Sequence, residues 1–373
     1  MVAVHRGQSE SDYRETDGSS EDMGKTVFVF GAGATRGCSF VDSTQGTCLP
    51  PLDRDFFTQL QRVRREKHRS TVTSVVEDMV RLFGTNFEVT LETAFATIEQ
   101  ITRMVEATRE TRSFKIGDLR EMRRRLLLAL AAVFEEALTK SSSKEKRVPH
   151  ECCYTRKFVE DVLRERDVVL TFNYDCVLDW HLKKYGNGKW NPRYGYGFRL
   201  GPRGKNLQGD REWMPQTRAP REKTVLLLKL HGSLHFKVDK ADKEEYIVRL
   251  KARPYTYQGK GMRFTIIPPE YVKRFERGVF RDIWKRAFRE LASSENVVFV
   301  GYSLPPTDAH ATALFRAGIG KGQLKALVIA NPDRDARRRI RTVVQRGLSE
   351  RTRVLSVDSF KEFVSIPRTV WDQ

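Results

Sequence analysis

The sequence predicts an α/β fold built on a doubly wound, mostly parallel sheet of six strands. Six short runs are apolar nearly throughout, which is typical of parallel strands covered on both faces. Helical patterns such as RDIWKRAFRELA (281–292) lie between some of these runs, and such alternation indicates a parallel sheet. A glycine-rich turn follows the first run. The six predicted strands are KTVFVF (25–30), VVLTF (168–172), VLLLKL (225–230), VVFVG (297–301), ALVIA (326–330) and RVLSV (353–357).

The ends of the chain and its cysteines indicate a cytoplasmic protein. Residues 1–24 are polar and contain no apolar segment, so we expect a disordered tail and not a secretory signal. No apolar run approaches the roughly 20 residues of a membrane helix. The five cysteines are odd in number and form no CxxC pair. Reduced thiols without a bound metal are therefore the expectation.

The chain is strongly basic, with a formal net charge of +19. Arginine clusters such as RVRREKHR (62–69) and DARRRIRTVVQR (335–346) carry much of this charge. Two interpretations stay open: solvated helix faces, or contact with nucleic acid, made directly or through a partner that handles it.

Two long segments interrupt the alternation within a domain that we expect to span residues 25–373. The first, about 51–165, reads as a helical insertion for packing and subunit contact, ending in the polar loop TKSSSKEKR (139–147). The second, about 183–223, is rich in glycine, proline and arginine, and we expect a surface loop near the site. In the first, one apolar helix face is predicted from Leu126, Leu127, Leu130, Phe134 and Leu138.

The turn after the first strand reads Gly31-Ala32-Gly33-Ala34-Thr35-Arg36-Gly37. Glycines allow a tight turn and close approach to a pyrophosphate. The spacing is GxGxxxG, not the strict dinucleotide fingerprint, and no acidic residue follows about 20 residues later at the end of a second strand. By itself the turn fits a phosphate site or a tight connection without a ligand.

Polar or glycine residues follow five of the predicted strands. In a parallel sheet the carboxyl ends of the strands lie on one edge, where open α/β folds bind their ligands. Helix capping explains one such end easily but not five together. Besides the glycine turn, the strand ends are Thr171-Phe172-Asn173-Tyr174-Asp175, Leu230-His231-Gly232-Ser233, Gly301-Tyr302-Ser303 continuing to Asp308, and Asn331-Pro332-Asp333.

Asn173 and His231 are the candidates for chemistry. An amide offers both a donor and an acceptor, which suits it to orienting a water or a sugar hydroxyl. An imidazole near neutrality can accept a proton from either. The alternative for His231 is a histidine that is merely hydrogen-bonded in its loop. We expect His235 to be structural.

Four motifs in order, FGAGATRG, TFNYD, LKLHGSL and VGYSLPPTD, resemble the sirtuin-like NAD-hydrolase family of bacterial antiphage defence systems. LPPLDRDFF (49–57), TLETAF (90–95), IIPPEYVK (266–273) and DIWKRAFREL (282–291) are also similar to this branch. The resemblance implies a Rossmann-like fold that binds NAD as a substrate, without metal, between the sheet and a helical module. It implies Asn173 and His231 as catalytic residues at the nicotinamide ribose. The dinucleotide-binding positions that it implies are Gly31, Ala32, Gly33, Thr35, Asp175, Gly301, Tyr302, Ser303, Asp308 and Asn331.

The departures from deacylating sirtuins favour a hydrolase. The chain lacks a four-cysteine zinc module, and Pro51-Leu52-Asp53 stands further from the glycine turn than their nicotinamide-gripping segment. The family implies NAD⁺ cleavage to nicotinamide and ADP-ribose by the effector subunit of an antiviral complex. Two alternatives remain, an NAD-dependent protein deacylase and a non-enzymatic subunit that binds NAD or ADP-ribose. We expect a homo-oligomer with a separate sensor or motor partner, such as a translocase ATPase, because only about forty residues follow Asn331.

Overall fold

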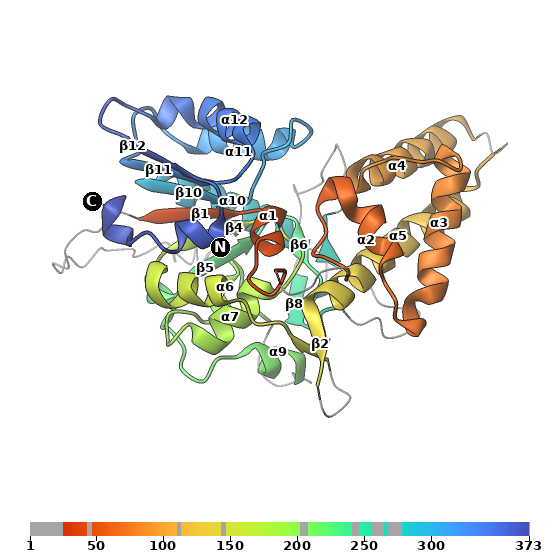
Figure 1. Cartoon of the computed structure of the whole chain (residues 1–373), viewed down its shortest axis with the longest axis horizontal. Coiled ribbons are helices and arrows are strands. Elements are labelled where there is room, and N and C mark those ends of the chain that lie inside the picture. The colour runs from red at the N-terminus through yellow and green to blue at the C-terminus, as the bar shows by residue number, and fades with distance from the viewer. Residues whose placement is uncertain are drawn as a thin grey trace, which may run out of the picture.

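A six-stranded parallel sheet runs through the larger part of the molecule (Figure 1). The computed structural model describes residues 25–42, 47–109, 113–142, 147–201, 208–240, 246–255, 265–267 and 278–372. The disordered tail predicted for residues 1–24 lies outside these ranges. The sheet strands are β1 (Thr26–Phe30), β4 (Val168–Thr171), β5 (Leu226–Lys229), β10 (Asn296–Val300), β11 (Ala326–Ala330) and β12 (Arg353–Val357).

The strand order is β12-β11-β10-β1-β4-β5, and each neighbouring pair is parallel. From β1, the chain first adds β4 and β5 on one side of the sheet. It then adds β10, β11 and β12 on the other side of β1. This is the doubly wound, Rossmann-like order that the sequence predicts. The point where the direction reverses lies between β1 and β10.

The register brings the carboxyl ends of the strands level. Phe30 pairs with Val300 on one side and with Thr171 on the other, and Thr171 pairs with Lys229. The residues that follow these strands therefore emerge along one edge. The same register holds across β10, β11 and β12, where Val300, Ala330 and Val357 are in line.

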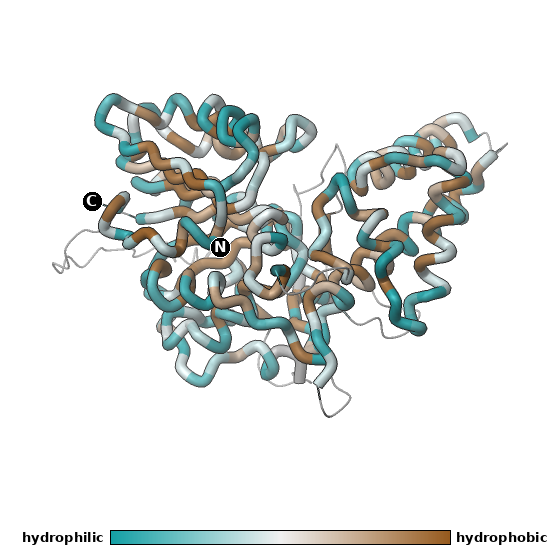
Figure 2. The backbone as a smooth tube through the Cα atoms, in the orientation of Figure 1, coloured by the Kyte–Doolittle hydropathy of each residue, from teal (hydrophilic) through white to brown (hydrophobic). Residues whose placement is uncertain are grey.

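Helices cover both faces of the sheet. Phe28 and Phe30 point to one face, where they contact Phe158 in a π-helical turn, η3 (Phe158–Val162). Phe299 points to the other face and contacts Phe315 on α11. The main helices of this part are α1 (Ala32–Arg36), α6 (Cys153–Lys157), α7 (Val177–Tyr185), α10 (Gly278–Ala292), α11 (Ala309–Gly318), α12 (Arg334–Val344) and α13 (Phe360–Phe363). Figure 2 shows hydrophobic residues gathered along the central strands, as a sheet buried on both faces requires.

A helical module lies beside the sheet (Figure 1), formed by α2 (Phe56–Gln61), α3 (Arg69–Phe83), α4 (Leu91–Thr108) and α5 (Ile116–Leu138). Both α3 and α4 pack on α5. The predicted apolar face of α5 is present, because Leu126, Leu130, Phe134 and Leu138 are buried and Leu127 is partly buried. Short 3₁₀ turns, η1 (Asp53–Asp55) and η2 (Glu66–His68), begin the module and join α2 to α3.

Two predicted loops differ from the structure. Thr139–Ser141 (β2) and Arg147–Pro149 (β3) pair as an antiparallel hairpin, within the segment predicted as a polar loop. The hairpin is held by Arg147, whose Nε donates to Thr139 Oγ1 at 2.7 Å. In the segment 183–223, Trp190, Tyr196 and Trp213 are buried. The described part of that segment packs into the core against Phe236 and does not form a surface loop.

The remaining elements are short. Two further two-stranded pairs follow β5: β6 (Gly232–Ser233) with β9 (Thr265–Ile266), and β7 (Phe236–Lys240) with β8 (Tyr246–Leu250). None of the described helices combines the length and hydropathy needed to cross a bilayer. The other short helices and turns are α8 (Pro192–Gly195), α9 (Gln208–Trp213), η4 (Arg221–Lys223), η5 (Gln345–Gly347) and η6 (Arg368–Val370).

Candidate functional site

The glycine turn packs against the end of β10 at the point where the strand order reverses. The amide of Gly31 donates to Val300 O at 3.1 Å, and that of Gly33 donates to Gly301 O at 2.9 Å. A Cβ on Gly31 would lie 2.6 Å from Tyr302 Cα, and one on Gly33 would lie 2.7 Å from Gly301 O. The glycines therefore serve the close approach of two loops.

Gly301 is the most constrained of these glycines. Its φ of +59° is unfavourable for residues with a side chain, and a Cβ there would lie 2.0 Å from the amide nitrogen of Ala34. The amides of Gly31 and Gly33 are engaged with the end of β10, and the exposed residues of the turn are Ala32 and Gly37. The phosphate cradle itself stays a prediction.

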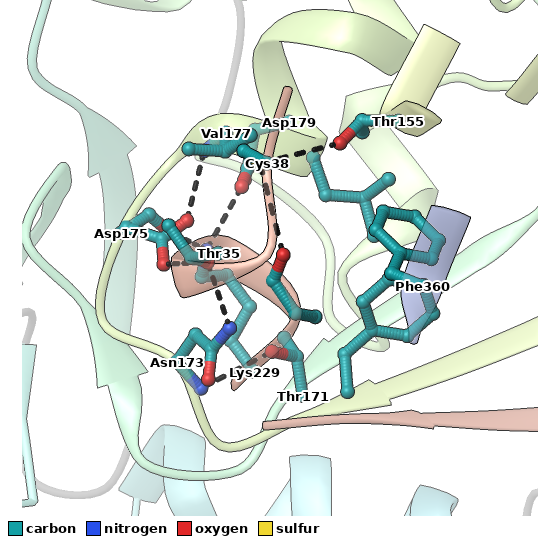
Figure 3. A pocket seen from close by; sticks show the side chains of 13 residues that line it. Thr35, Cys38, Thr155, Thr171, Asn173, Asp175, Val177, Asp179, Lys229 and Phe360 are labelled. Carbon is teal, nitrogen blue, oxygen red and sulfur yellow. Dashed lines mark hydrogen bonds and ion pairs between the residues drawn. The ribbon is translucent and has the colours of Figure 1, made fainter. Parts of the chain in front are cut away.

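Asn173 is held against the glycine turn (Figure 3). Its Nδ2 donates to Gly31 O at 2.9 Å and to Thr35 Oγ1 at 3.2 Å. A carbonyl oxygen only accepts, so the nitrogen of the amide must face Gly31. Oδ1 then points elsewhere, and no described residue donates to it. The side chain is partly exposed and offers an acceptor at the edge of the sheet.

Asp175 links the same turn to α1 from inside the protein. Thr35 Oγ1 donates to Asp175 Oδ2 at 2.8 Å, and the amide of Val177 donates to Oδ1 at 2.9 Å. Burial raises the pKa of Asp175, although Lys229 nearby opposes that rise. Both carboxylate oxygens accept hydrogen bonds within the protein, and the binding role of Asp175 stays a prediction.

Lys229 and Asp179 lie beneath this turn and were missed by the sequence reasoning. Lys229 Nζ donates to Asp179 Oδ2 at 2.8 Å and to the carbonyl oxygen of Asp175 at 2.5 Å. Burial alone would raise the pKa of Asp179, but Lys229 holds it below its ordinary value. The sequence held one signal for this pair, because Lys229 is the single charged residue of the apolar run VLLLKL. A buried cation requires a partner of opposite charge.

His235 belongs to this interior network. Ser233 Oγ lies 2.7 Å from its Nδ1, and Tyr196 OH lies 3.0 Å from its Nε2. Burial lowers the pKa of His235 to about 3, so the ring is neutral. The prediction that His235 is structural agrees with this position.

His231 follows β5 and faces the loop between β10 and α11. Its Nε2 lies 4.0 Å from Asp308 Oδ2, which also accepts a hydrogen bond from Tyr302 OH at 3.0 Å. The ring of Phe172 meets the His231 ring edge-on at 5.1 Å and stacks on Tyr302 at 4.3 Å. His231 is thus set in an aromatic wall, with a carboxylate on its far side.

The predicted site residues therefore form two adjoining groups. Asn173, Thr35 and Asp175 gather around α1, whereas His231, Tyr302 and Asp308 gather at the start of α11. The two groups meet at Gly31, whose carbonyl accepts from Asn173 and whose Cα abuts Tyr302. The convergence of Asn173 and His231 on one ligand stays a prediction.

Asn331 and Ser303 complete the edge of the second group. Asn331 Nδ2 donates to Tyr302 O at 3.0 Å, which ties the end of β11 to the loop after β10. Ser303 is exposed, and its carbonyl accepts from Arg339 at 3.1 Å. Asn331 is buried, and its side chain is hydrogen-bonded to Tyr302. Its predicted role in binding the dinucleotide stays a prediction.

The helical module reaches the site at the same loop. Thr307 Oγ1 donates to Glu92 Oε2 at 2.6 Å, and the amide of Glu92 donates to Asp53 Oδ1 at 2.8 Å. Arg36 of α1 forms an ion pair with Asp55. Burial raises the pKa of Asp53. Asp53 and Glu92 lie in LPPLDRDFF and TLETAF, two segments whose similarity to the family was noted, but the sequence reasoning named neither as a site residue.

A small cavity lies behind the first group (Figure 3). Its volume is about 20 Å³, which is room for about one water. Thr35, Cys38, Thr155, Asn173 and Asp175 are among the residues that line it. Within the described ranges, no group of three or more His, Cys, Asp or Glu side chains is placed to hold a metal ion.

Residues 167–349 match the SIR2-like domain family. This segment is sirtuin-like. The matched segment includes Asn173, His231, Tyr302 and Asn331, whereas the glycine turn at Gly31 precedes it. The resemblance that the motifs indicate is thereby confirmed at the level of the family, and a SIR2-like domain supports an NAD-related activity in general.

Other comparisons add little. No curated protein matches the chain. One solved structure is described as "Structural Basis for the Mechanism and Regulation of Sir2 Enzymes". Its alignment covers 92% of this chain and 90% of the other chain, at 12% sequence identity and a TM-score of 0.28. The fold is established by the strand order itself.

Proposed function

We propose that this protein hydrolyses NAD⁺ to nicotinamide and ADP-ribose. The observation that carries the proposal is the hydrogen bond from Asn173 Nδ2 to Gly31 O, made within a sirtuin-like chain. This bond fixes an asparagine amide beside the glycine turn at the reversal point of the sheet, where doubly wound folds bind nucleotides. It also turns the acceptor Oδ1 away from the turn, and we expect that oxygen to meet a sugar hydroxyl or a water.

Cleavage of the glycosidic bond of NAD⁺ does not require a general acid. The nicotinamide of NAD⁺ is cationic before the glycosidic bond breaks and leaves as a neutral molecule. The enzyme must instead stabilise a ribose that develops positive charge, and must position a water. Asn173 Oδ1 would accept a hydrogen bond from that water or from a ribose hydroxyl, while His231 would accept the proton of the water.

The aromatic wall around His231 supports the same assignment. Phe172 and Tyr302 stack at 4.3 Å with an interplanar angle of 5°, and Phe172 meets the imidazole edge-on at 5.1 Å. Apolar rings exclude bulk water from a reacting centre, which strengthens the polar contacts that remain. Asp308 at 4.0 Å would stabilise the imidazolium that forms after proton transfer.

The test is nicotinamide release from NAD⁺ by Asn173→Ala and His231→Ala, measured by chromatography. We expect each variant to lose about a hundredfold or more in kcat. The matched control is Asn191→Ala, because Asn191 also bridges backbone groups, at Arg193 N and Ala219 O, but lies outside the site. Wild-type turnover in both site variants would overturn the assignment.

The same assay separates the alternative functions. A protein deacylase would release nicotinamide only when an acyl-lysine peptide is added. A non-enzymatic subunit would bind NAD⁺ or ADP-ribose, measured by calorimetry, and release nothing. We expect release from NAD⁺ without peptide.

We further propose that the protein is the effector of an antiviral complex, as a homo-oligomer with a separate sensor or motor partner. The similarity of its four motifs to antiphage sirtuin-like proteins supports this role. Cells that carry the system should lose NAD⁺ after phage infection. Unchanged NAD⁺ during successful defence would contradict the role and leave the activity in vitro untouched.

A further inference from the structure

Two buried cysteines meet directly behind the candidate site. Cys38 follows α1 by two residues, and Cys152 immediately precedes α6. Both are buried, with 1% and 0% of their surfaces exposed. Cys38 Sγ lies 3.8 Å from Thr155 Oγ1, and the amide of Thr155 donates to Cys152 Sγ at 3.4 Å. Thr155 therefore touches both sulfur atoms.

The chain segments of the two cysteines are held together by further bonds. The amide of Ser39, next to Cys38, donates to Cys152 Sγ at 3.4 Å. In return, the amide of Cys153, next to Cys152, donates to Ser39 Oγ at 2.9 Å. These reciprocal bonds fix the loop after α1 against the start of α6 and hold the two thiols in one place.

The two thiols differ in character. The neighbouring Cys38 thiol, together with donors from Thr155 and Ser39, lowers the pKa of Cys152 to about 5 despite burial. Burial raises the pKa of Cys38 well above its ordinary value. Cys152 is therefore the more acidic of the two thiols. By contrast, burial raises the pKa of Cys48 to about 12.

The small cavity reaches one member of this pair, Cys38, from the candidate site, and Cys152 is not among the residues that line it. Cys38 and Thr155 line one part of the cavity, while Thr35 and Asn173 line another. Its volume of about 20 Å³ admits a molecule about the size of water.

We propose that Cys38 and Cys152 form an oxidisable pair that peroxide converts to a disulfide. The Cys152 thiolate attacks one oxygen of hydrogen peroxide, the O–O bond breaks, and hydroxide leaves, giving a sulfenic acid at Cys152. The Cys38 sulfur then attacks the Cys152 sulfur. The S–O bond breaks, and the departing hydroxide takes the Cys38 proton to form water. The first hydroxide takes up the proton that the Cys152 thiol released to solvent. Two thiol groups thus lose two electrons, and one peroxide becomes two waters.

The disulfide would act on the candidate site through α1. Thr35, one turn before Cys38, is bonded to both Asn173 and Asp175. A covalent link from Cys38 to α6 would move or fix α1 and therefore the amide of Asn173. The disulfide itself is independent of the proposed NAD⁺ hydrolysis, whereas this effect on turnover rests on that function.

The experiment treats the full-length protein with hydrogen peroxide, blocks the remaining thiols, and identifies disulfide-linked peptides by mass spectrometry. We expect a peptide joining Cys38 to Cys152 in the wild type and in Cys153→Ser, the matched control at the exposed neighbouring cysteine. In Cys38→Ser, dimedone should trap a sulfenic acid at Cys152. A reducing agent should reverse the link.

The wild-type protein alone can overturn the proposal. If Cys38 and Cys152 remain as thiols while Cys153 is oxidised, or if Cys152 pairs with another cysteine, the pair has no such role. This measurement on the wild-type protein requires neither a folded variant nor NAD⁺. A negative result for the disulfide is therefore distinguishable from failure of the proposed hydrolase activity. If the link forms and NAD⁺ turnover changes less than about twofold, only the coupling to the site is wrong.

Discussion

Asn173 and Gly31 are joined by a hydrogen bond of 2.9 Å, although 142 positions separate them in the chain. The bond connects the end of β4 to the end of β1, and the register of the sheet makes it available because Phe30 and Thr171 lie level. The same glycine abuts Tyr302, so the two strand-end groups of the candidate site share one backbone position.

The close packing of Gly301 predicts a large cost for a side chain there. Gly301→Ala would place a Cβ against the Ala34 amide at a positive φ, so we expect a loss of about 2–3 kcal/mol in the free energy of unfolding. Gly322→Ala is the control, since Gly322 has a φ of +64° with no atom within 4 Å. The control should lose about 1 kcal/mol. Equal losses in urea denaturation would contradict the packing argument.

The buried charge of Lys229 predicts a second stability effect. Lys229→Met leaves Asp179 buried without its cation, so we expect a loss of about 3–5 kcal/mol in the free energy of unfolding. Lys223→Met is the control, because its ion pair with Glu165 is about half exposed and should contribute less than about 1 kcal/mol. A loss below about 1 kcal/mol in Lys229→Met would show that Asp179 is satisfied without the lysine.

Glu135 predicts a stability change with pH. Burial alone would raise its pKa, but hydrogen bonds from His68 and Lys67 outweigh burial and lower it from 4.5 to about 2. Because the folded pKa lies below the unfolded value, this stabilisation is fully present above pH 4.5 and is lost as the pH falls toward 2. The difference corresponds to about 3 kcal/mol.

The measurement compares wild type with Glu135→Gln by urea denaturation at several pH values. The gap between the two proteins should narrow by about 3 kcal/mol between pH 5 and pH 2. A constant gap over that range would mean that Glu135 titrates at its ordinary pKa in the folded protein.

The sheet could be predicted from the sequence because its strands carry their own signal. Runs such as ALVIA (326–330) are apolar throughout, and only a strand covered on both faces accommodates them at that length. The hairpin of β2 and β3 had no such signal. It depends on Arg147, which reaches Thr139 across the turn, and such a contact is visible only after folding.

The candidate site could be predicted only as far as the strand ends. Parallel strands place Asn173 and His231 on one edge, but the direction of each side chain depends on the turn that follows its strand. Asn173 turns to α1 and His231 turns to Asp308. The second insertion, about 183–223, was likewise predicted as a surface loop because it is rich in glycine and proline. Trp190 and Tyr196 within it are buried.

The most direct test is the structure of the protein with a hydrolysis-resistant NAD⁺ analogue. We predict that the pyrophosphate lies at the glycine turn, and that Asn173 Oδ1 and the imidazole of His231 both lie within hydrogen-bonding distance of the nicotinamide ribose or of the water beside it. A ribose that contacts only one of these side chains, or one that Phe172 separates from His231, would contradict the proposed active site.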